Sequence, residues 1–362
     1  MKFGLFYQLP CADTQSEPIR YQETIEQIQH ADTLGFDCAW LAELHFYKTF
    51  SIMSSPLILA TAIAQRTKRI RLGIAVNLLP LQHPLRSAED GATVDILTNG
   101  RLEFGVGRGA IPLHFAGFDV SREDSRERFE ESLEVMKKAW GPTAFSHDGK
   151  YYHIPETNVV PKPLQKPHPP LRVAANSPDT AVFAGKSHYP IFVASVTNPL
   201  PRMVEQVARY RTAWNNTPAP SGDHSASEPN VSTMFFFHPG ENLDQVRQDI
   251  EPSLTNYFRS VSGMVQAGVK SEGAQANDES YRYLQDVQKM VDTITFDKIN
   301  ESMAIFGSSQ ECLAKAKWLH KEMGMKELIC WFNPGGLVPH EKVQQAMSRF
   351  AAEIMPELRE LL

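Results

Sequence analysis

The amino-acid sequence predicts an α/β fold, a TIM (β/α)8 barrel with insertions, in which all 362 residues form a single domain. Three observations support this prediction. Short apolar runs alternate with segments of helical periodicity throughout residues 1–110. Eight candidate strands follow one another along the chain, with helices between most of them. Polar or glycine-rich segments come directly after several of these strands, where a barrel carries its active site. A doubly wound open sheet is the alternative fold.

The candidate strands are short apolar runs, as expected for parallel strands that are buried on both faces. The clearest is 72–79, which is rich in aliphatic side chains, and 102–106 follows it after a helix. A strand–helix–strand unit this short predicts a parallel pair. In chain order the eight candidates are 2–7, 38–41, 72–79, 102–106, 171–175, 191–194, 234–237 and 327–332.

The helices are recognised by apolar residues three or four positions apart and by their end signals. In 86–97, Ala88, Ala92 and Ile96 recur at this spacing, and Asn99-Gly100 stops the helix. Further along the chain, Ser177 suits an N-cap and Pro178 the first helical position. Helices are expected at 19–34, 56–67, 86–97, 122–140, 200–214, 240–258 and 308–323, and from about residues 178 and 340 onward.

Three segments interrupt this alternation and are interpreted as insertions near 144–170, 216–230 and 259–296. The first contains Asp148-Gly149 between β-prone runs, which predicts a hairpin. The second is rich in Pro, Ser, Asn and Asp, a composition typical of loops. The third is small and polar over 263–278, and we expect it to form a lid over the site. A loop without a role is the alternative.

The composition excludes several classes of partner. The chain has 36 basic and 42 acidic residues, a net charge of −6, and no long basic run, so neither nucleic acid nor an anionic membrane is expected as a partner. No apolar stretch approaches the length of a membrane span, and the N-terminus lacks a signal-peptide pattern. The four cysteines lack metal-ligand spacing, so we expect reduced, mostly buried thiols, a cytoplasmic location and no metal site.

A candidate anion site follows the fourth strand. The glycines at 105, 107 and 109 leave the backbone open around Arg108, and a cation with bare amides at a strand end suits phosphate. The alternative is that the glycines only form a turn and Arg108 is solvated.

The helix that begins after Ser177 adds free amides, the positive end of its dipole and the hydroxyls of Ser177 and Thr180. Together with Arg108 and with Arg126 on the helix 122–140, these groups could neutralise a phosphate dianion. The plain alternative is that Ser177 serves only as an N-cap.

Several segments resemble the bacterial luciferase-like flavin monooxygenases. The central one is HPLRSAEDGATVDILTNGRLEFGVGRG, residues 83–109. KFGLFYQLP, GFDCAWLAELHF, RVAANSPDTA and FNPGGLVPHEKV also agree, in the same order along the chain. Most of the chain is therefore similar to this family, over roughly residues 1–200 and 296–356.

The resemblance implies that the chain binds FMN in its reduced form, FMNH2. It assigns the FMN phosphate to Arg108, Arg126, Ser177 and Thr180, which match the family's positions. A non-proline cis peptide is usual beneath the isoalloxazine ring, and here it matches Ile74-Ala75 or Ala75-Val76. The remaining ring contacts would come from Ala174, Asn77 and Asn176, although each asparagine could instead satisfy loop backbone.

The segment Glu43-Leu44-His45 departs from the family pattern. Many members have two adjacent histidines after the glutamate, and the first is implicated in catalysis. Leu44 stands at that position and cannot exchange a proton, so light emission through this residue is not expected. The catalytic candidates are Glu43, His45, His83 and His114, because histidine titrates near neutral pH. A structural role is the alternative for each histidine.

No GxGxxG follows the first strand, so a nicotinamide dinucleotide site is not predicted. The resemblance implies a two-component monooxygenase that receives FMNH2 from a separate flavin reductase. With O2 it would hydroxylate a small organic substrate, free or bound to a carrier protein, or insert oxygen in a Baeyer–Villiger reaction. The alternatives are a non-catalytic flavin-binding protein, which Leu44 favours, and a deazaflavin-dependent oxidoreductase. A barrel hydrolase ranks last, because no His/Asp cluster is seen.

A homodimer is also expected. The family pairs through the helices after strands two and three, and these helices here carry small residues that allow close approach, namely Ala60, Ala62, Ala64, Ala88 and Ala92. The same residues would also pack well within a monomer.

Overall fold

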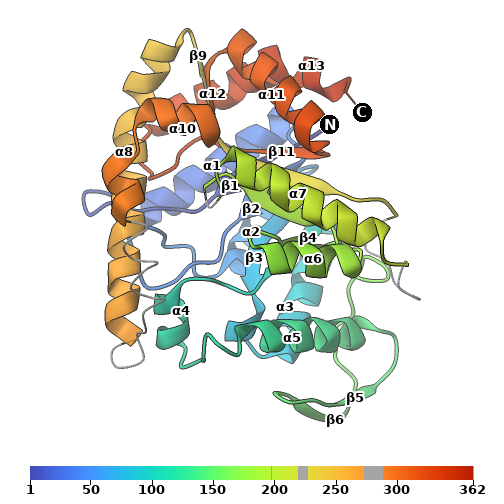
Figure 1. The fold of residues 1–362 in the computed structure, drawn as a ribbon. Coiled ribbons are helices and arrows are strands. Elements are labelled where there is room, and N and C mark those ends of the chain that lie inside the picture. Colours follow the sequence, from blue (N-terminus) through green and yellow to red (C-terminus); the bar gives the residue numbers. More distant parts are fainter. Residues whose placement is uncertain (197, 219–226, 273–287, 362) are drawn as a thin grey trace.

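Eight parallel strands close into a barrel in the computed structural model, which describes residues 1–196, 198–218, 227–272 and 288–361 (Figure 1). Strand β11 pairs with β1, and β8 pairs with β9, so the ring is complete. The predicted barrel is confirmed, and the open sheet is excluded because it would leave two edges unpaired. Around the ring the strands are β1 (Lys2–Tyr7), β2 (Cys38–Leu41), β3 (Arg71–Leu78), β4 (Leu102–Gly107), β7 (Leu171–Ala174), β8 (Ile191–Ala194), β9 (Val231–Gly240) and β11 (Glu327–Trp331).

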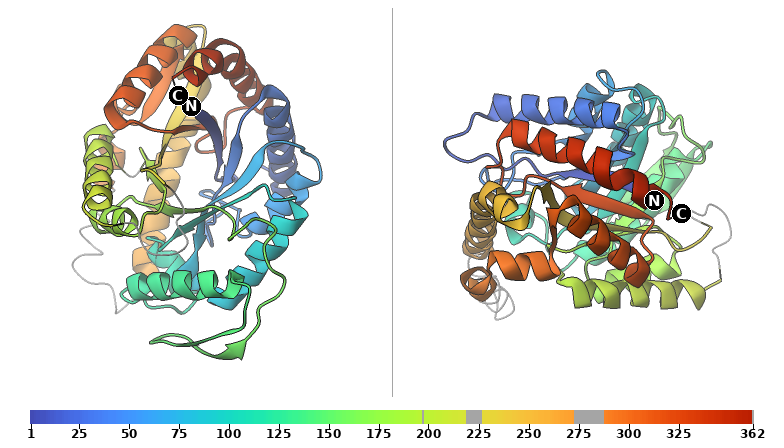
Figure 2. Two further views of the ribbon diagram at one scale, coloured as in Figure 1. Left: turned by 90° about the vertical axis from the view of Figure 1, so that its right-hand side faces the viewer. Right: turned by 90° about the horizontal axis from the view of Figure 1, so that it is seen from above.

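Helices surround the strands as an outer ring, and the two chain ends lie side by side (Figure 2). The long helices are α1 (Glu17–Leu34), α2 (Pro56–Ala64), α3 (Pro84–Leu97), α5 (Ser125–Trp140), α6 (Pro178–Lys186), α7 (Leu200–Asn215), α8 (Leu243–Glu272), α11 (Ser309–Met323) and α12 (His340–Arg349). Shorter helical segments are η1 (Leu79–Leu81), α4 (Pro112–Gly117), α10 (Phe296–Ser302), the π-helical η3 (Phe350–Ile354) and α13 (Met355–Arg359).

The helix ends carry the residue types expected there. Gly35 and Gly324 end α1 and α11 in the left-handed conformation, with φ of 94° and 53°. Asn99 and Gly100 also take positive φ, 55° and 73°, directly after α3. Ser308 caps α11 and forms a reciprocal capping box with Glu311.

A single tryptophan fills much of the barrel at the amino-terminal ends of the strands. Trp40 is 1% exposed, donates from Nε1 to Oε1 of Glu327 at 2.8 Å, and packs edge-on against Phe192. Gly73 and Gly4 make room for it, because a Cβ at Gly73 would collide with the indole ring. Trp40 therefore packs the barrel interior at this level, and the carboxyl-terminal mouth is where barrels of this kind carry their sites.

Helix α8 is longer than predicted. The loop expected from residue 263 is helical as far as Glu272, and residues 273–287 of the third insertion lie outside the described residues. The small residues serve close packing, because Gly263 lies against the hydroxyl of Tyr47, and Gly268 against Leu113. The prediction of a loop from the small, polar composition was therefore wrong for residues 263–272.

Two further differences concern strands. β10 (Ala304–Ser308) was not predicted, and it pairs with the second half of β9, which runs well beyond the predicted 234–237. The predicted hairpin is present as β5 (Phe145–Asp148) and β6 (His153–Thr157), which project from the barrel (Figure 1). Residues 219–226 of the second insertion lie outside the described residues.

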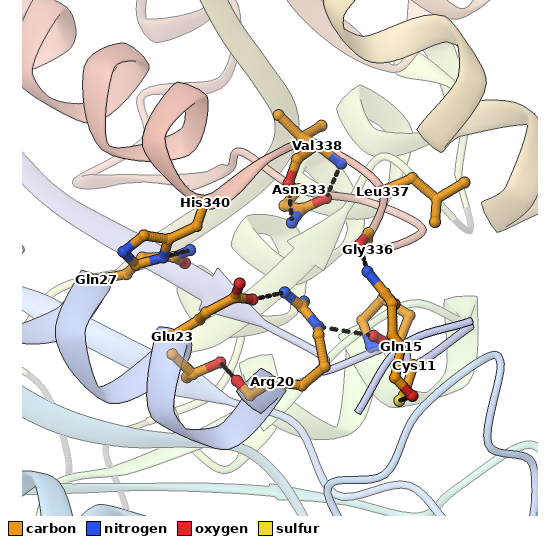
Figure 3. A network of polar contacts seen from close by, with 12 residues as sticks. Cys11, Gln15, Arg20, Glu23, Gln27, Asn333, Gly336, Leu337, Val338 and His340 are labelled. Atoms are coloured by element: carbon orange, nitrogen blue, oxygen red, sulfur yellow. Dashed lines mark hydrogen bonds and ion pairs between the residues drawn. The ribbon is translucent and has the colours of Figure 1, made fainter. Parts of the chain in front are cut away.

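The loop after β11 is fixed by polar contacts, and Figure 3 shows those within the loop and with Gln15. Within the loop, Asn333 and Val338 are joined by two hydrogen bonds. Gln15, from the loop after β1, donates to the carbonyl of Gly336 at 2.7 Å. Ser253 of α8 donates to the carbonyl of Pro334. These polar groups of the loop are therefore paired with other groups of the protein.

All four cysteines are buried free thiols, as predicted. No helix among the described residues is long and apolar enough to cross a membrane.

Candidate functional site

Glu43 is the centre of a hydrogen-bond cluster at the barrel mouth. Its side chain follows β2, is 4% exposed and accepts four hydrogen bonds. Oε2 accepts from Nδ2 of Asn77 at 3.1 Å and from the N–H of Leu78 at 3.2 Å. Oε1 accepts from Nε2 of Gln82 at 3.0 Å and lies 3.1 Å from Nε2 of His45. A carboxylate with this set of donors is held in one orientation.

His45 and His114 meet beside Glu43 but differ in what they can do. The N–H of His45 donates to Nε2 of His114 at 3.1 Å, so that nitrogen is an acceptor. Burial, and then the neighbouring His45, lowers the pKa of His114 to about 3. His114 is therefore neutral at ordinary pH and supports the loop that carries His45. The ring of His45 has Nε2 on Glu43, and its Nδ1 makes no hydrogen bond with the residues that the structure describes.

The rings of Phe46 and Phe118 pack against His45, with centroids 5.5 Å and 4.8 Å away. Both phenylalanines are exposed, at 55% and 42%. The histidine is thus screened on one side by apolar surface.

Beside this cluster, β3 is irregular over Ile74 to Asn77. The Ala75–Val76 peptide is cis, at one of the two bonds predicted from the sequence, and the register with β4 shifts between Ile74 and Asn77. The side chains of Ala75 and Val76 are half-buried, unlike those of their neighbours. Oδ1 of Asn77, whose side chain is 1% exposed, has no partner among the described residues. This buried acceptor is therefore available to a ligand.

The glycines of β4 fit against this irregular segment. A Cβ at Gly105 would collide with the carbonyl oxygen of Ile74, and one at Gly107 with the side chain of Val76. These two glycines therefore allow β4 to approach β3 closely, and they do not merely expose backbone amides to an anion. Only Gly109 takes positive φ, 79°. A Cβ at Gly107 would also lie 3.7 Å from the Cβ of Ala174, so small residues continue from β4 to β7.

Arg108 follows β4 as predicted. Its guanidinium is half-buried and makes no hydrogen bond or ion pair with another residue in the described part of the chain. Burial, and then the like charge of Arg126, lowers its pKa, whereas Asp179 acts in the opposite direction. The predicted pair of arginines is therefore brought together. Arg126 forms an ion pair with Asp179, Nη2 to Oδ2, at 2.7 Å.

Ser177 and Thr180 begin α6 next to these charges. Ser177 is the N-cap and accepts from the N–H of Thr180 at 3.4 Å, and the two hydroxyl oxygens lie 2.9 Å apart. Pro178 occupies the first turn, as predicted. The free amides of the helix start therefore face the same region as Arg108 and Arg126.

Two predicted residues have other partners. Oδ1 of Asn176 accepts from the N–H of Ala194 at 3.0 Å, so Asn176 satisfies the backbone of β8, which was the alternative considered for it. His83 is exposed at the start of α3, where Nδ1 accepts from the N–H of Leu85 and the ring packs on Tyr152. The structure therefore places His83 outside the Glu43 cluster.

Sequence reasoning missed Gln82 and Asp179. Gln82 donates to Glu43 and accepts from the hydroxyl of Ser87. Its only sequence signal was its place before His83-Pro84. Asp179 lies between Ser177 and Thr180 in the first turn of α6, where an acid is common at any helix start and so gave no signal of a site.

These groups follow the barrel rim in order. β2, β3, β4 and β7 are consecutive strands, and adjacent strands lie about 4.8 Å apart, so these groups follow about 14 Å of the curved rim. An acid–histidine pair lies at one end, and two arginines with a helix start lie at the other. Between them lie small side chains and the amide oxygen of Asn77, which has no partner in the part of the chain that the structure describes.

Comparison with protein families gives one match over most of the chain. Residues 1–326 match the family model described as luciferase-like monooxygenase.

Among curated proteins, the oxygenase component of a flavin-dependent trigonelline monooxygenase from Acinetobacter baylyi is 27% identical, over 99% of this chain and 96% of that protein. An alkanal monooxygenase alpha chain from the Kryptophanaron alfredi symbiont is 25% identical, over 99% of both chains.

Solved structures share the fold. Monooxygenase RslO1 from Streptomyces bottropensis has a TM-score of 0.77 at 22% identity, covering 99% of this chain and 100% of that one. The oxygenating constituent of 3,6-diketocamphane monooxygenase from Pseudomonas putida, in complex with FMN, has a TM-score of 0.76 at 18% identity, covering 99% and 98%. A coenzyme F420-dependent tetrahydromethanopterin reductase from Methanopyrus kandleri has a TM-score of 0.67 at 18% identity, covering 98% and 99%.

Proposed function

Because the chain belongs to the luciferase-like monooxygenase family, we propose that it is the FMNH2-dependent oxygenase component of a two-component monooxygenase. It receives FMNH2 from a separate flavin reductase and uses O2 to hydroxylate a small organic substrate or to insert oxygen into it. The observation that carries this proposal is the order of groups along the rim from β2 to β7.

The residues present fit a flavin mononucleotide. Arg108, Arg126 and the amides at the start of α6 would hold its phosphate, with the hydroxyls of Ser177 and Thr180. The half-buried Ala75 and Ala174 would lie against the flat ring, since neither has bulk that would displace it. The unpaired Oδ1 of Asn77 is suited to accept from a ring N–H.

Bound FMNH2 would supply the reaction with O2, and the chain would supply orientation, exclusion of water and proton handling. Glu43 fixes the His45 ring through Nε2, which leaves Nδ1 to hold or move a proton. Phe46 and Phe118 keep water from one side of that ring. His114, neutral and already an acceptor, positions His45 and does not exchange protons itself.

The test is stoichiometric binding of FMNH2 under anaerobic conditions, followed by an oxygen pulse. We expect one flavin per chain and a slowed return of the oxidised-flavin absorbance relative to free FMNH2. Absence of any flavin binding would refute the proposal. Binding with immediate oxidation and only hydrogen peroxide as product, whatever substrate is offered, would favour the non-catalytic flavin-binding protein, for which Leu44 is the motivation.

A deazaflavin-dependent oxidoreductase is the second candidate. It is favoured by the shared fold of the F420-dependent reductase. Binding of a deazaflavin in preference to FMN would establish it.

We also propose a homodimer through α2 and α3. Four of the five alanines that motivated this expectation are buried within the chain's own core, so they do not carry the argument. The proposal rests instead on exposed aliphatic side chains of these helices, namely Ile58 (73% exposed), Ile96 (44%) and Leu97 (48%). Ile58 and Leu97 also line a groove of about 310 Å³ between α2 and α3, whose lining includes Glu43 and Asn77.

A further inference from the structure

The predicted phosphate site contains an acid. Asp179 lies in the first turn of α6, between the two residues proposed to bind phosphate through their hydroxyls, Ser177 and Thr180. Its carboxylate pairs with Arg126 at 2.7 Å and also influences the pKa of Arg108. The Asp179 side chain is 71% exposed and that of Arg126 44% exposed, so both can turn toward solvent or a ligand.

The charges at this point do not match a phosphate monoester by themselves. Two arginines and one aspartate give a net charge of +1, whereas a phosphate monoester carries close to −2 near neutral pH. Removal of the aspartate charge would leave +2. An acid in the first turn stabilises a helix, which is enough to explain why Asp179 stands at this position. It does not explain why the acid is paired with an arginine of α5, 53 positions away.

We propose that Asp179 is a built-in competitor of the flavin phosphate. It holds Arg126 when no flavin is bound and releases Arg126 when the phosphate arrives, so that it weakens flavin retention. This inference rests on the proposed function. An oxygenase that takes FMNH2 from a reductase must release oxidised FMN after each turnover, and weaker retention of the flavin would favour that release. The opposite possibility is that Asp179 aims Arg126 at the phosphate and so strengthens binding.

The two roles predict opposite signs for one measurement. We would titrate the wild-type protein and Asp179→Asn with oxidised FMN and follow the flavin fluorescence. If Asp179 competes, D179N binds FMN about two- to fivefold more tightly, the effect expected for an exposed charge pair. The difference should narrow at high salt, because exposed charges are screened.

Riboflavin, which has the same ring and no phosphate, is the matched ligand control, and its affinity should be equal in both proteins. Glu357→Gln is the matched variant control, since Glu357 of α13 is also an exposed acid, at 57%, and is paired with Lys317 of α11. It should bind FMN as the wild type does. Thermal unfolding confirms that D179N is folded.

Unchanged or weaker FMN binding by D179N would overturn the inference and leave the proposed function intact. Equal tightening of riboflavin would also overturn it, because the effect would not act through the phosphate. If the wild type bound neither oxidised FMN nor, under anaerobic conditions, FMNH2, the proposed function itself would be refuted.

Discussion

At the scale of single residues, two histidines meet at the barrel mouth with ring centroids 5.3 Å apart, and burial separates their roles. His114 is 2% exposed and acts as an acceptor with a depressed pKa, whereas His45 is paired with an acid. The sequence indicates both as catalytic candidates, because it gives the residue type and the strand end. The burial of each ring and the partner of each ring nitrogen decide which histidine can exchange a proton. Both depend on how α4, which carries His114, packs against the loop of His45, 69 positions away in the sequence.

The depressed pKa of His114 predicts a pH-dependent stability. Its pKa is about 3 in the folded state and 6.5 when unperturbed, so the unfolded chain binds the proton first as the pH falls. Stability is therefore lost from about pH 6.5 downward, by about 1.4 kcal/mol per pH unit for one proton. His114→Gln keeps an acceptor for the His45 N–H and should flatten this slope, measured by urea unfolding at a series of pH values. His238, whose pKa burial lowers to about 4, adds a similar dependence that remains. His153→Gln, at an exposed site, should keep the full slope, and an unchanged slope in H114Q would contradict the assignment.

Glu43 gives the second prediction at this scale. Glu43→Gln replaces a carboxylate that accepts four hydrogen bonds by an amide with one acceptor, so buried donors lose their partner. We expect the free energy of unfolding to fall by about 1–3 kcal/mol and turnover with FMNH2 to fall with it. Glu205→Gln removes an exposed partner of Arg209 and should change the stability by less than about 0.5 kcal/mol. If both variants were equally stable, Glu43 would not be the structural centre of the cluster.

At the scale of elements, the predictable parts are those with a strong period and an end signal. All eight barrel strands could be placed from apolar runs, and α11 from Ser308 and Gly324. Helix α8 could not be followed past residue 258, because Gly263 and Gly268 are selected for close packing and resemble a loop in composition. β10 was not predicted, because it pairs with the second half of β9, which extends beyond the segment predicted as a strand.

The fit between β3 and β4 gives a prediction for these elements. In Gly105→Ala the added methyl group would collide with backbone, the Ile74 carbonyl, which cannot move without disturbing the strand pair. We expect a loss of about 3 kcal/mol or more in the free energy of unfolding, or insoluble protein. Gly35→Ala meets no atom within 4 Å and suffers only from its positive φ of 94°, so it should cost roughly 1–2 kcal/mol. Chemical unfolding of the two variants compares them, and equal losses would show that close approach does not matter at Gly105.

At the scale of the whole molecule, the fold could be predicted because alternation and end signals agree along the entire chain. The site could be predicted only in outline. Parallel strands that close into a barrel bring Glu43, Asn77, Arg108 and Ser177 to one rim, whatever their separation in sequence. The pairing of Arg126 with Asp179 depends instead on how α5 and α6 lie against each other, which no local pattern encodes.

The assembly gives the last prediction, because aliphatic residues of α2 and α3 are exposed on the single chain. Ile58→Lys places a charge where a partner would bury a side chain that is 73% exposed here. If the proposed dimer forms through this face, the wild type should have twice the 40.7 kDa mass of one chain in light scattering after gel filtration, and I58K should have the single-chain mass at micromolar concentration. Ile19→Lys makes the same change at a residue of α1 that is 58% exposed, and it should remain dimeric. A wild-type monomer would refute the dimer, and a dimeric I58K would move the interface to another face. The groove that reaches Glu43 and Asn77 opens between the same two helices, so loss of the dimer in I58K should also weaken flavin binding if the partner helps to close it.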